Sequence, residues 1–186
     1  MIGYAFCGSF CTHKRSLDAL EKIIGAGYEV QPIMSDIAYT TDTRFARAEE
    51  LKEKIKALTG REIIHTVKDA EPLGPKMPLE ALIIAPCTGN TLAKLAQGIT
   101  DTSVTMAAKA HLRKDRPLLI ALASNDAMSQ NLGNIAKLIT RRSVYFVPME
   151  QDDPAGKPHS LVADFGALPE AFFAMRRGEQ MRKMFI

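Results

Sequence analysis

The chain has 186 residues, with 24 Lys and Arg against 21 Asp and Glu, and 46% of its residues are hydrophobic. This length and composition predict one globular domain over residues 1–186, large enough to bury a core without disulfides or a structural metal. Its apolar runs are too short to cross a bilayer, and an excess of three positive charges is no footprint of nucleic-acid binding. We therefore expect neither a membrane nor a nucleic acid as a partner.

The cysteines and the first residues point to the cytoplasm. Cys7, Cys11 and Cys87 are odd in number and form no CxxC pair, which favours free thiols in a reducing compartment. The first positive charges follow the apolar opening MIGYAF, whereas a secretory signal peptide has them in the reverse order. We expect no metal site, because Cys7 and Cys11 do not stand in the company of His and Asp or Glu residues that a metal site has.

Short apolar runs alternate with segments of helical period along the whole chain. Strands are predicted near residues 2–7, 29–34, 62–67, 81–86, 117–123 and 144–148. Helices are predicted over residues 17–24, 45–58, 90–97, about 102–112, about 129–141 and 168–177. Asp42 can cap the second helix and Gly60 can end it. The alternation predicts an α/β fold, a three-layer doubly wound parallel sheet.

Two segments interrupt this alternation. Residues 70–78 contain Pro72, Pro75 and Pro78, and residues 150–160 read QDDPAGKPH at their centre. Both compositions are typical of surface loops, and both loops are candidate lids or contact surfaces. The C-terminal helix, about 168–177, and the tail after it are expected to pack on the domain or on a neighbouring subunit.

In a parallel sheet of this kind, ligands bind beyond the carboxyl ends of the strands. Gly8 and Ser9 follow the first predicted strand and lead straight into a helix, an arrangement that suits a phosphate. An ordinary strand-to-helix turn has the same composition. The segment matches neither GxGxxG nor GxxxxGK[ST], and Asp36 lies 28 residues beyond Gly8, which is too far for the usual ribose contact.

The most informative segment is residues 81–101, ALIIAPCTGNTLAKLAQGITD. We expect Pro86 to end the strand, and Thr88, Gly89, Asn90 and Thr91 then follow at the edge of the sheet. Uncharged hydroxyls and an amide suit a ribityl chain or a heteroaromatic ring, although Thr88 or Asn90 could instead simply cap the next helix. Residues 124–126, Ser-Asn-Asp, follow the fifth strand and admit the same two interpretations.

The segment APCTGNTLAKLAQGITD resembles the APATANTIAK-A-GIAD signature of a flavoprotein family. That family includes the flavin-dependent cysteine decarboxylases, phosphopantothenoylcysteine decarboxylase and the prenyl-flavin synthases. The resemblance covers about residues 1–140 and implies a Rossmann-like flavoprotein fold that binds FMN between neighbouring subunits. The positions that match the family's flavin site are Gly8, Ser9 and Phe10 for the phosphate loop, Ser35 for a second phosphate contact, and Thr88, Gly89, Asn90 and Thr91 along the flavin.

The chain also departs from the family's decarboxylases. Their catalytic His falls here on Pro72, which carries no proton to transfer, and His65 lies seven residues earlier as a weak substitute. Of their substrate-binding PAMNxxM motif, Asn125 and Met128 are kept, which implies a carboxylate-bearing ligand of another kind. Asn125 is a second weak candidate for catalysis, and the catalytic base itself stays unknown.

Over nearly all 186 residues the chain also resembles one branch of the same family. Three segments carry this resemblance: GYAFCGSFCTHKR, MSDIAYTTDTRF and DFGALPEAFFAMRRGEQ. That branch supplies one of the two kinds of chain in an oxidoreductase of sporulating bacteria, which oxidises dihydrodipicolinate to dipicolinate at a branch of the lysine pathway. The resemblance implies a homo-oligomer and a partner, the A subunit of that enzyme, which binds NAD(P). A bound NAD(P) on the partner would explain why this chain lacks GxGxxG.

Two alternatives stay open at this point. The chain could be an autonomous FMN-dependent decarboxylase, or a non-catalytic scaffold with a vestigial flavin pocket. In each case 186 residues leave no room for a separate substrate domain, so a partner or neighbouring copy is expected to complete the site.

Overall fold

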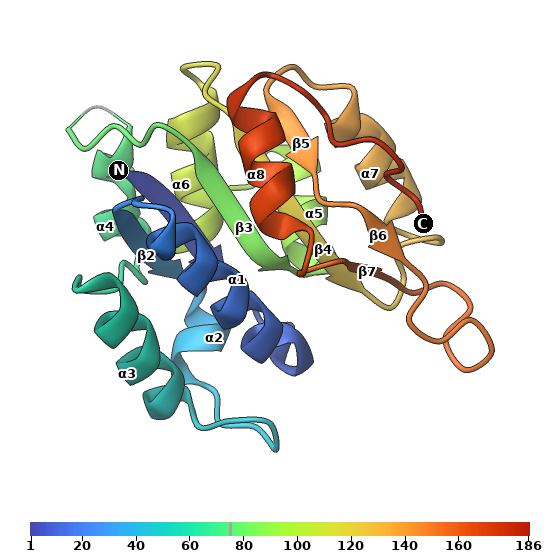
Figure 1. Ribbon diagram of the computed structural model, residues 1–186, viewed down its shortest axis with the longest axis horizontal. Helices are drawn as coiled ribbons and strands as arrows, with labels where there is room; N and C mark the ends of the chain where they lie inside the picture. The colour runs from blue at the N-terminus through green and yellow to red at the C-terminus, as the bar shows by residue number, and fades with distance from the viewer. Residues whose placement is uncertain (75) are drawn as a thin grey trace.

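A central sheet runs through the molecule with helices on both faces (Figure 1). The computed structural model describes residues 1–74 and 76–186. The strands are β1 (Ile2–Phe6), β2 (Val30–Met34), β3 (Leu82–Cys87), β4 (Leu118–Ser124), β5 (Val144–Phe146), β6 (Met149–Glu150) and β7 (Leu161–Ala163). The helices are η1 (Phe10–Thr12), α1 (His13–Gly25), α2 (Asp36–Thr40), α3 (Ala48–Thr59), α4 (Val67–Ala70), η2 (Glu71–Leu73), α5 (Gly89–Gln97), α6 (Ser103–Leu112), α7 (Leu132–Ile139) and α8 (Leu168–Arg176).

The strand order confirms the doubly wound sheet. The strands β2, β1, β3, β4 and β5 lie side by side in that order, and all of these pairs are parallel. The end of β4 also pairs with β7, and β7 pairs with β6, and both of these pairs are antiparallel. The direction of winding reverses between β1 and β3, which is where such folds open a crevice for ligands.

Successive strand side chains point to opposite faces of the sheet, and helices bury both faces. In β1, Tyr4 and Phe6 face one core, to which α1, α3 and α8 contribute. Ala5 faces a second core, which is formed with α5, α6 and α7. Each large apolar side chain buried in these cores contributes roughly 1.5–3 kcal/mol to the free energy of unfolding. No helix in the described ranges is long and apolar enough to cross a membrane.

One predicted strand is wrong. Residues 62–67 form no strand, and Ile64 makes only a single bridge to Ile33. The Thr66 hydroxyl accepts a hydrogen bond from the Asp69 backbone N–H at 3.1 Å and so caps the short helix α4. A capping side chain thus ends the extended segment where its apolar residues alone would continue it.

Two predicted helices are shorter than their patterns suggest. Helix α3 begins at Ala48, whose backbone N–H donates to the Asp42 carboxylate at 2.8 Å. Phe45 therefore precedes the helix and is 53% exposed. The helix predicted over residues 129–141 spans only Leu132–Ile139, because turns occupy residues 125–131.

Several turn residues behave as predicted, and one does not. Gly60 ends α3 in the left-handed region at φ +64°, and residues 151–160 form an irregular loop between β6 and β7. Pro86 does not end β3 but lies inside it, where the register with β4 shifts between Ile84 and Cys87. Within residues 70–78, η2 covers Glu71–Leu73, and Pro75 lies outside the described residues.

The C-terminal segment packs on the rest of the chain. Leu168, Phe172 and Met175 of α8 are buried in the first core. The tail runs beside β6, where the Met149 backbone N–H donates to the Met184 carbonyl at 2.8 Å. Figure 1 shows this tail crossing from α8 toward α7 and β6.

Candidate functional site

Two adjoining hollows lie at the carboxyl ends of the central strands. The first has a volume of about 620 Å³ and is lined by the segments after β1, β3 and β4 together with residues of the 150–160 loop. The second has a volume of about 320 Å³ and lies between the ends of β1, β2 and β3. Gly8, Thr88 and Asn90 line both, so the two hollows meet at the point where the strand order reverses.

The structure brings the predicted cofactor residues together at this edge. The first hollow is lined by Gly8, Ser9, Phe10, Thr88, Gly89 and Asn90. The second is lined by Gly8, Ser35, Thr88, Asn90 and Thr91. Asn125, the predicted substrate contact, also lines the first hollow.

Two other candidates lie elsewhere. The His65 ring stacks on the Tyr39 ring, with centroids 3.8 Å apart, and neither hollow is lined by a histidine of the described chain. Met128 packs against the second core, and its backbone N–H donates to the His159 carbonyl at 2.9 Å. Since Met128 lines neither hollow of the described structure, we assign it no ligand contact.

The turn after β1 is held in place by local hydrogen bonds. The Thr12 hydroxyl donates to the Ser9 carbonyl at 2.8 Å, and the His13 ring Nε2 lies 2.7 Å from the Cys7 carbonyl. Burial lowers the pKa of His13, so the neutral ring donates its Nε2–H to that carbonyl. A Cβ at Gly8 would come within 2.9 Å of Ile37, which explains the glycine between the two hollows.

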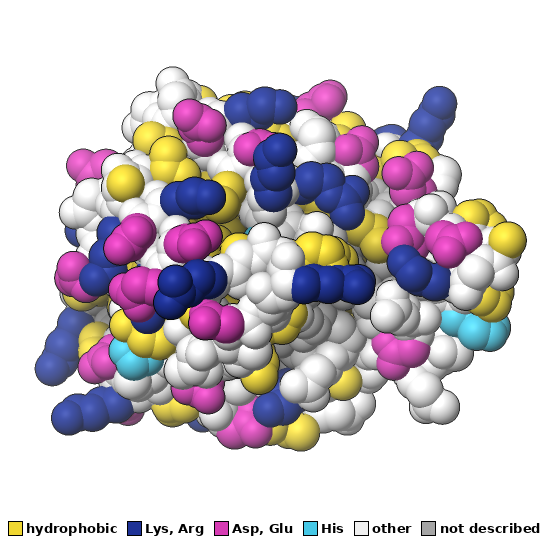
Figure 2. All heavy atoms as spheres, turned by 90° about the horizontal axis from the view of Figure 1, so that it is seen from below, with side chains coloured by type: hydrophobic (Ala, Val, Ile, Leu, Met, Phe, Trp, Pro, Cys, Tyr) yellow, Lys and Arg dark blue, Asp and Glu magenta, His cyan; other side chains and the backbone are white. Residues whose placement is uncertain are grey.

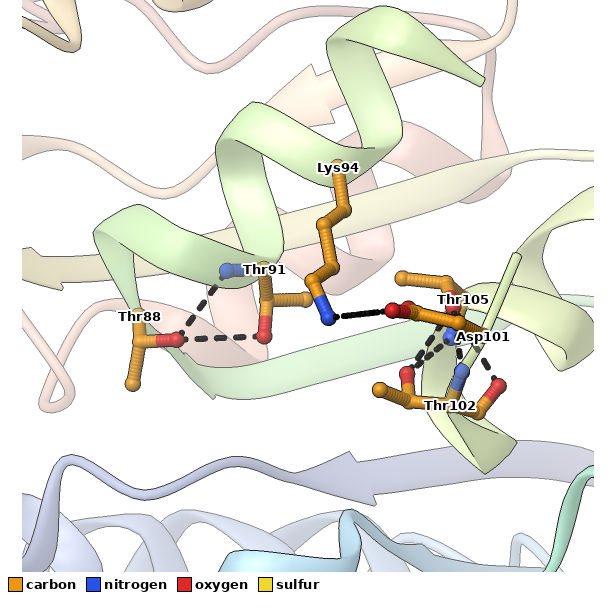
Figure 3. A network of polar contacts seen from close by, with 6 residues as sticks. All are labelled: Thr88, Thr91, Lys94, Asp101, Thr102 and Thr105. Atoms are coloured by element: carbon orange, nitrogen blue, oxygen red, sulfur yellow. Dashed lines mark hydrogen bonds and ion pairs between the residues drawn. The ribbon is translucent and has the colours of Figure 1, made fainter. Parts of the chain in front are cut away.

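The family-like signature has a clear structural role (Figure 3). Thr88 caps α5, because its hydroxyl accepts the Thr91 backbone N–H at 3.2 Å. The Lys94 ammonium lies 2.8 Å from both oxygens of Asp101, and this contact lowers the pKa of Asp101. Thr102 and Thr105 then form a reciprocal capping box at the start of α6. Thr88 of the signature thus fixes the start of α5, which borders both hollows, and the capping box that directly follows the signature fixes the start of α6.

Gly89 carries a second packing constraint. A Cβ there would lie 2.6 Å from Asn131 Nδ2 and 2.8 Å from Asp126 Oδ1, and would also overlap the Ser124 hydroxyl. Ser124 and Asn131 both donate hydrogen bonds to the Asp126 carboxylate and lower its pKa. The missing side chain at Gly89 therefore lets α5 lie against this polar cluster.

Sequence reasoning missed three cations in the first hollow, Arg15, Arg44 and Lys157. Arg15 follows the turn after β1, whereas Arg44 and Lys157 belong to irregular segments. Figure 2 views the molecule from the side on which α2 lies in Figure 1, and Lys or Arg side chains border the hollowed surface near the centre. The sequence signal that could have revealed these cations is a basic residue shortly after a strand. Such residues are common on any protein surface, so the signal is not specific.

The donor set of the second hollow fits a nucleotide. Ser35, Thr91 and Thr102 supply hydroxyls and Asn90 supplies an amide, and Asp36 is the one carboxylate of the described lining. Helix α5 begins here, and the first backbone N–H groups of a helix have no intrahelical acceptor. Such uncharged donors suit the phosphate and hydroxyl groups of a flavin mononucleotide.

Two known proteins are similar to this chain over its whole length. The B subunit of dipicolinate synthase from Bacillus subtilis (strain 168) is 39% identical over 185 residues, which cover 100% of this chain and 92% of that protein. A crystal structure of the B subunit of dipicolinate synthase from Bacillus halodurans C has a TM-score of 0.91 and 40% identity, covering 100% of this chain and 95% of that one.

A more distant structure shows the same fold. The FMN-dependent cysteine decarboxylase SpaF has a TM-score of 0.68 at 23% identity, covering 94% of this chain and 95% of that one. The Flavoprotein family model matches residues 1–167, which are most of the sequence. The chain therefore belongs to the flavoprotein family.

Proposed function

We propose that the chain is the B subunit of a dipicolinate synthase, which acts with the A subunit of that enzyme to oxidise dihydrodipicolinate to dipicolinate during sporulation. The observation that carries this proposal is the 39% identity to the Bacillus subtilis B subunit over the full length of the chain. The oxidation removes a hydride and a proton from the ring of the substrate. The A subunit binds the NAD(P)⁺ that accepts the hydride, and solvent takes the proton.

In this proposal the two hollows form an FMN-type pocket. The turn at Gly8, Ser9 and Phe10 and the Ser35 hydroxyl would hold the phosphate, and residues 88–91 would lie along the flavin; all of these residues line the hollows. When bound, FMN would supply redox chemistry. Asn125, at the end of β4, orients the substrate with its side-chain amide.

The open shape of the site supports completion by another chain. Ile37 and Phe45 border the hollows, and each is 53% exposed although apolar. Exposed apolar side chains at the border of a pocket are typical of a surface that another protein chain covers. We propose that the chain works as a homo-oligomer in the cytoplasm and binds the A subunit there.

Nothing in the geometry favours an autonomous decarboxylase. The family's catalytic His is replaced by Pro72, which lies in η2 and not among the described residues that line the hollows. His65 is stacked on Tyr39 and is no substitute in this position.

The proposal is tested by mixing the purified chain with the A subunit, dihydrodipicolinate and NAD(P)⁺, and recording the formation of reduced nicotinamide. We expect the pair to be faster than the A subunit alone, and equal rates would refute the proposal. Binding of FMN to the chain is followed by quenching of flavin fluorescence.

The variant Asn90→Ala separates a working pocket from a vestigial one. We expect it to weaken FMN binding and slow the pair, while Gln130→Ala, an exposed polar residue outside both hollows, changes neither. If the pair is fast and Asn90→Ala has no effect on it, the chain is a scaffold with a vestigial flavin pocket.

A further inference from the structure

We infer that Arg15 and Arg44 form a pair of carboxylate-binding forks, which recognise the two carboxylates of a planar dicarboxylate in the first hollow. The inference rests on the proposed function, because it identifies the residues that select the substrate.

Each guanidinium is held over an aromatic ring. The central carbon of the Arg15 guanidinium lies 5.3 Å from the centroid of Phe165, and that of Arg44 lies 4.9 Å from the centroid of Phe45. A guanidinium at this distance from a ring is attracted to the face of the ring. This attraction uses none of its N–H groups, which can still bind a ligand.

Both arginines keep their hydrogen-bonding capacity. Within residues 1–74 and 76–186, no carboxylate lies within 4.0 Å of either guanidinium, and neither donates a hydrogen bond to the protein. Both side chains line the first hollow. An arginine fork binds a carboxylate through two parallel hydrogen bonds, which makes it a strong and directional contact.

The remaining charges of the first hollow are already engaged. Lys157 pairs with Asp152 at 3.1 Å, and Asp152 also accepts the Ser160 hydroxyl at 2.8 Å. The Asp126 carboxylate accepts hydrogen bonds from Ser124 and Asn131. Arg15 and Arg44 are therefore the charges of this described lining that a dianion can use without first breaking a contact.

The two hollows differ in charge, which separates a dicarboxylate from a phosphate. The described lining of the second hollow contains hydroxyls, an amide and Asp36, but no Lys or Arg. Gly8 and Ser35, which take part in the proposed phosphate site, line this neutral hollow, whereas Ser9, Phe10 and the two cationic forks line the first hollow. A pyridine ring with two carboxylates matches two forks, and a ring with one carboxylate can occupy only one of them.

The experiment measures binding of pyridine-2,6-dicarboxylate, pyridine-2-carboxylate and inorganic phosphate to the purified chain by calorimetry. The same ligands are titrated into Arg15→Gln, Arg44→Gln and the control Arg142→Gln, an exposed arginine outside the hollow. A hydrogen bond to a charged group contributes roughly 1.5–3 kcal/mol, and 1.4 kcal/mol is tenfold in affinity. We expect the wild type to prefer the dicarboxylate.

Arg15→Gln and Arg44→Gln should each lower the affinity for the dicarboxylate by about tenfold or more. The affinity of each variant for the dicarboxylate should then approach that for the monocarboxylate, a change that a merely structural defect does not produce. FMN affinity and the Arg142→Gln titrations should stay at wild-type values. Equal losses for phosphate or FMN would show that the arginines serve a phosphate, and unchanged dicarboxylate affinity would likewise overturn the inference.

The same variants in the pair with the A subunit separate this inference from the proposed function. If the pair oxidises dihydrodipicolinate and neither variant raises the KM for it, the proposed role of the two arginines is wrong and the proposed function is supported. If the chain binds the dicarboxylate through both arginines and the pair forms no product, the proposed function is wrong and the proposed role of the two arginines is supported. A wild-type chain that binds no dicarboxylate, alone or in the pair, also overturns the inference.

Discussion

At the scale of single residues, Gly89 tests how tightly α5 lies against the end of β4. Intrinsic helix propensity favours alanine over glycine by about 1 kcal/mol. The contacts oppose that gain, because an added Cβ would lie 2.6 Å from Asn131 Nδ2 and 2.8 Å from Asp126 Oδ1. We predict that Gly89→Ala lowers the free energy of unfolding by about 1–3 kcal/mol in urea denaturation.

The matched control is Gly133→Ala in α7. A Cβ at Gly133 would meet nothing within 4 Å, so the propensity gain is unopposed. This variant should be as stable as the wild type or more stable, by up to about 1 kcal/mol. A gain in stability for both alanine variants would contradict the prediction. It would mean that the polar cluster of Ser124, Asp126 and Asn131 moves away from α5 at little cost.

His111 gives a prediction on pH. Its ring is buried on α6, its Nε2–H donates to the Pro117 carbonyl at 2.9 Å, and its Nδ1 has no partner among the described residues. Burial lowers the pKa of His111 from 6.5 to about 4. Below pH 6.5 the unfolded chain therefore binds a proton that the folded chain excludes until about pH 4.

The stability that the neutral ring provides is thus lost as the pH falls from 6.5 toward 4. At 1.36 kcal/mol per pKa unit this loss amounts to about 3 kcal/mol. His111→Gln keeps a donor but cannot titrate, so we predict a smaller difference between urea midpoints at pH 7 and pH 4. His159→Gln, in the exposed loop, should keep the wild-type difference, and a matching change there would contradict the assignment to His111.

At the scale of elements, the start of α6 depends on Thr102. Its hydroxyl accepts the Thr105 backbone N–H at 3.1 Å, and Thr105 Oγ1 accepts the Thr102 backbone N–H at 3.1 Å. We predict that Thr102→Ala lowers the free energy of unfolding by about 1 kcal/mol, because it removes the N-cap. Thr102→Ser keeps the cap and should restore most of that loss in the same urea titration.

The neighbouring ion pair should matter less. Lys94 and Asp101 lie in partial contact with water, and exposed pairs contribute at most about 1 kcal/mol. If Lys94→Met proved more costly than Thr102→Ala, the ion pair and not the cap would be what holds α6 in place.

The elements also show what a sequence pattern can and cannot predict. Helices α1, α5, α6 and α8 were predictable from their apolar residues, and at α5 a capping threonine and a terminal glycine agree with that pattern. Strands β6 and β7 have two and three residues, too few for an alternation to be visible. The apolar residues near Ile64 suggested a strand, but Thr66 starts α4 and ends the extended segment.

Some residues of the candidate site could likewise be predicted from the sequence, and others could not. Gly8, Thr88 and Asn90 could be predicted, because each follows a strand whose carboxyl end must lie at the same edge of the sheet. Arg15 and Arg44 could not, because one lies on a helix and the other in an irregular segment. Their guanidinium groups lie over Phe165 and Phe45 and line one hollow, an arrangement that depends on tertiary structure.

At the scale of the whole molecule, one sheet joins two cores. Tyr28 packs with the first core, where its ring lies 5.0 Å from the Phe172 ring, and Met106 of α6 packs against the second core. Neighbouring side chains of β1, Tyr4 and Ala5, belong to different cores, so neither core can come apart without disturbing the strand that both share. Such coupling favours a single cooperative unfolding transition.

The chain contains no Trp, so a single Trp can report on each core separately. We predict that Tyr28→Trp and Met106→Trp, both at half-buried positions, each unfold in urea with a fluorescence midpoint equal to the far-ultraviolet circular dichroism midpoint of the same variant. Comparing the two probes within one variant removes any stability change that the Trp itself causes. Coincident midpoints in both variants mean that the two cores unfold together as one domain over residues 1–186. A fluorescence midpoint that departs from the dichroism midpoint in either variant would mean that the core it reports on unfolds by itself.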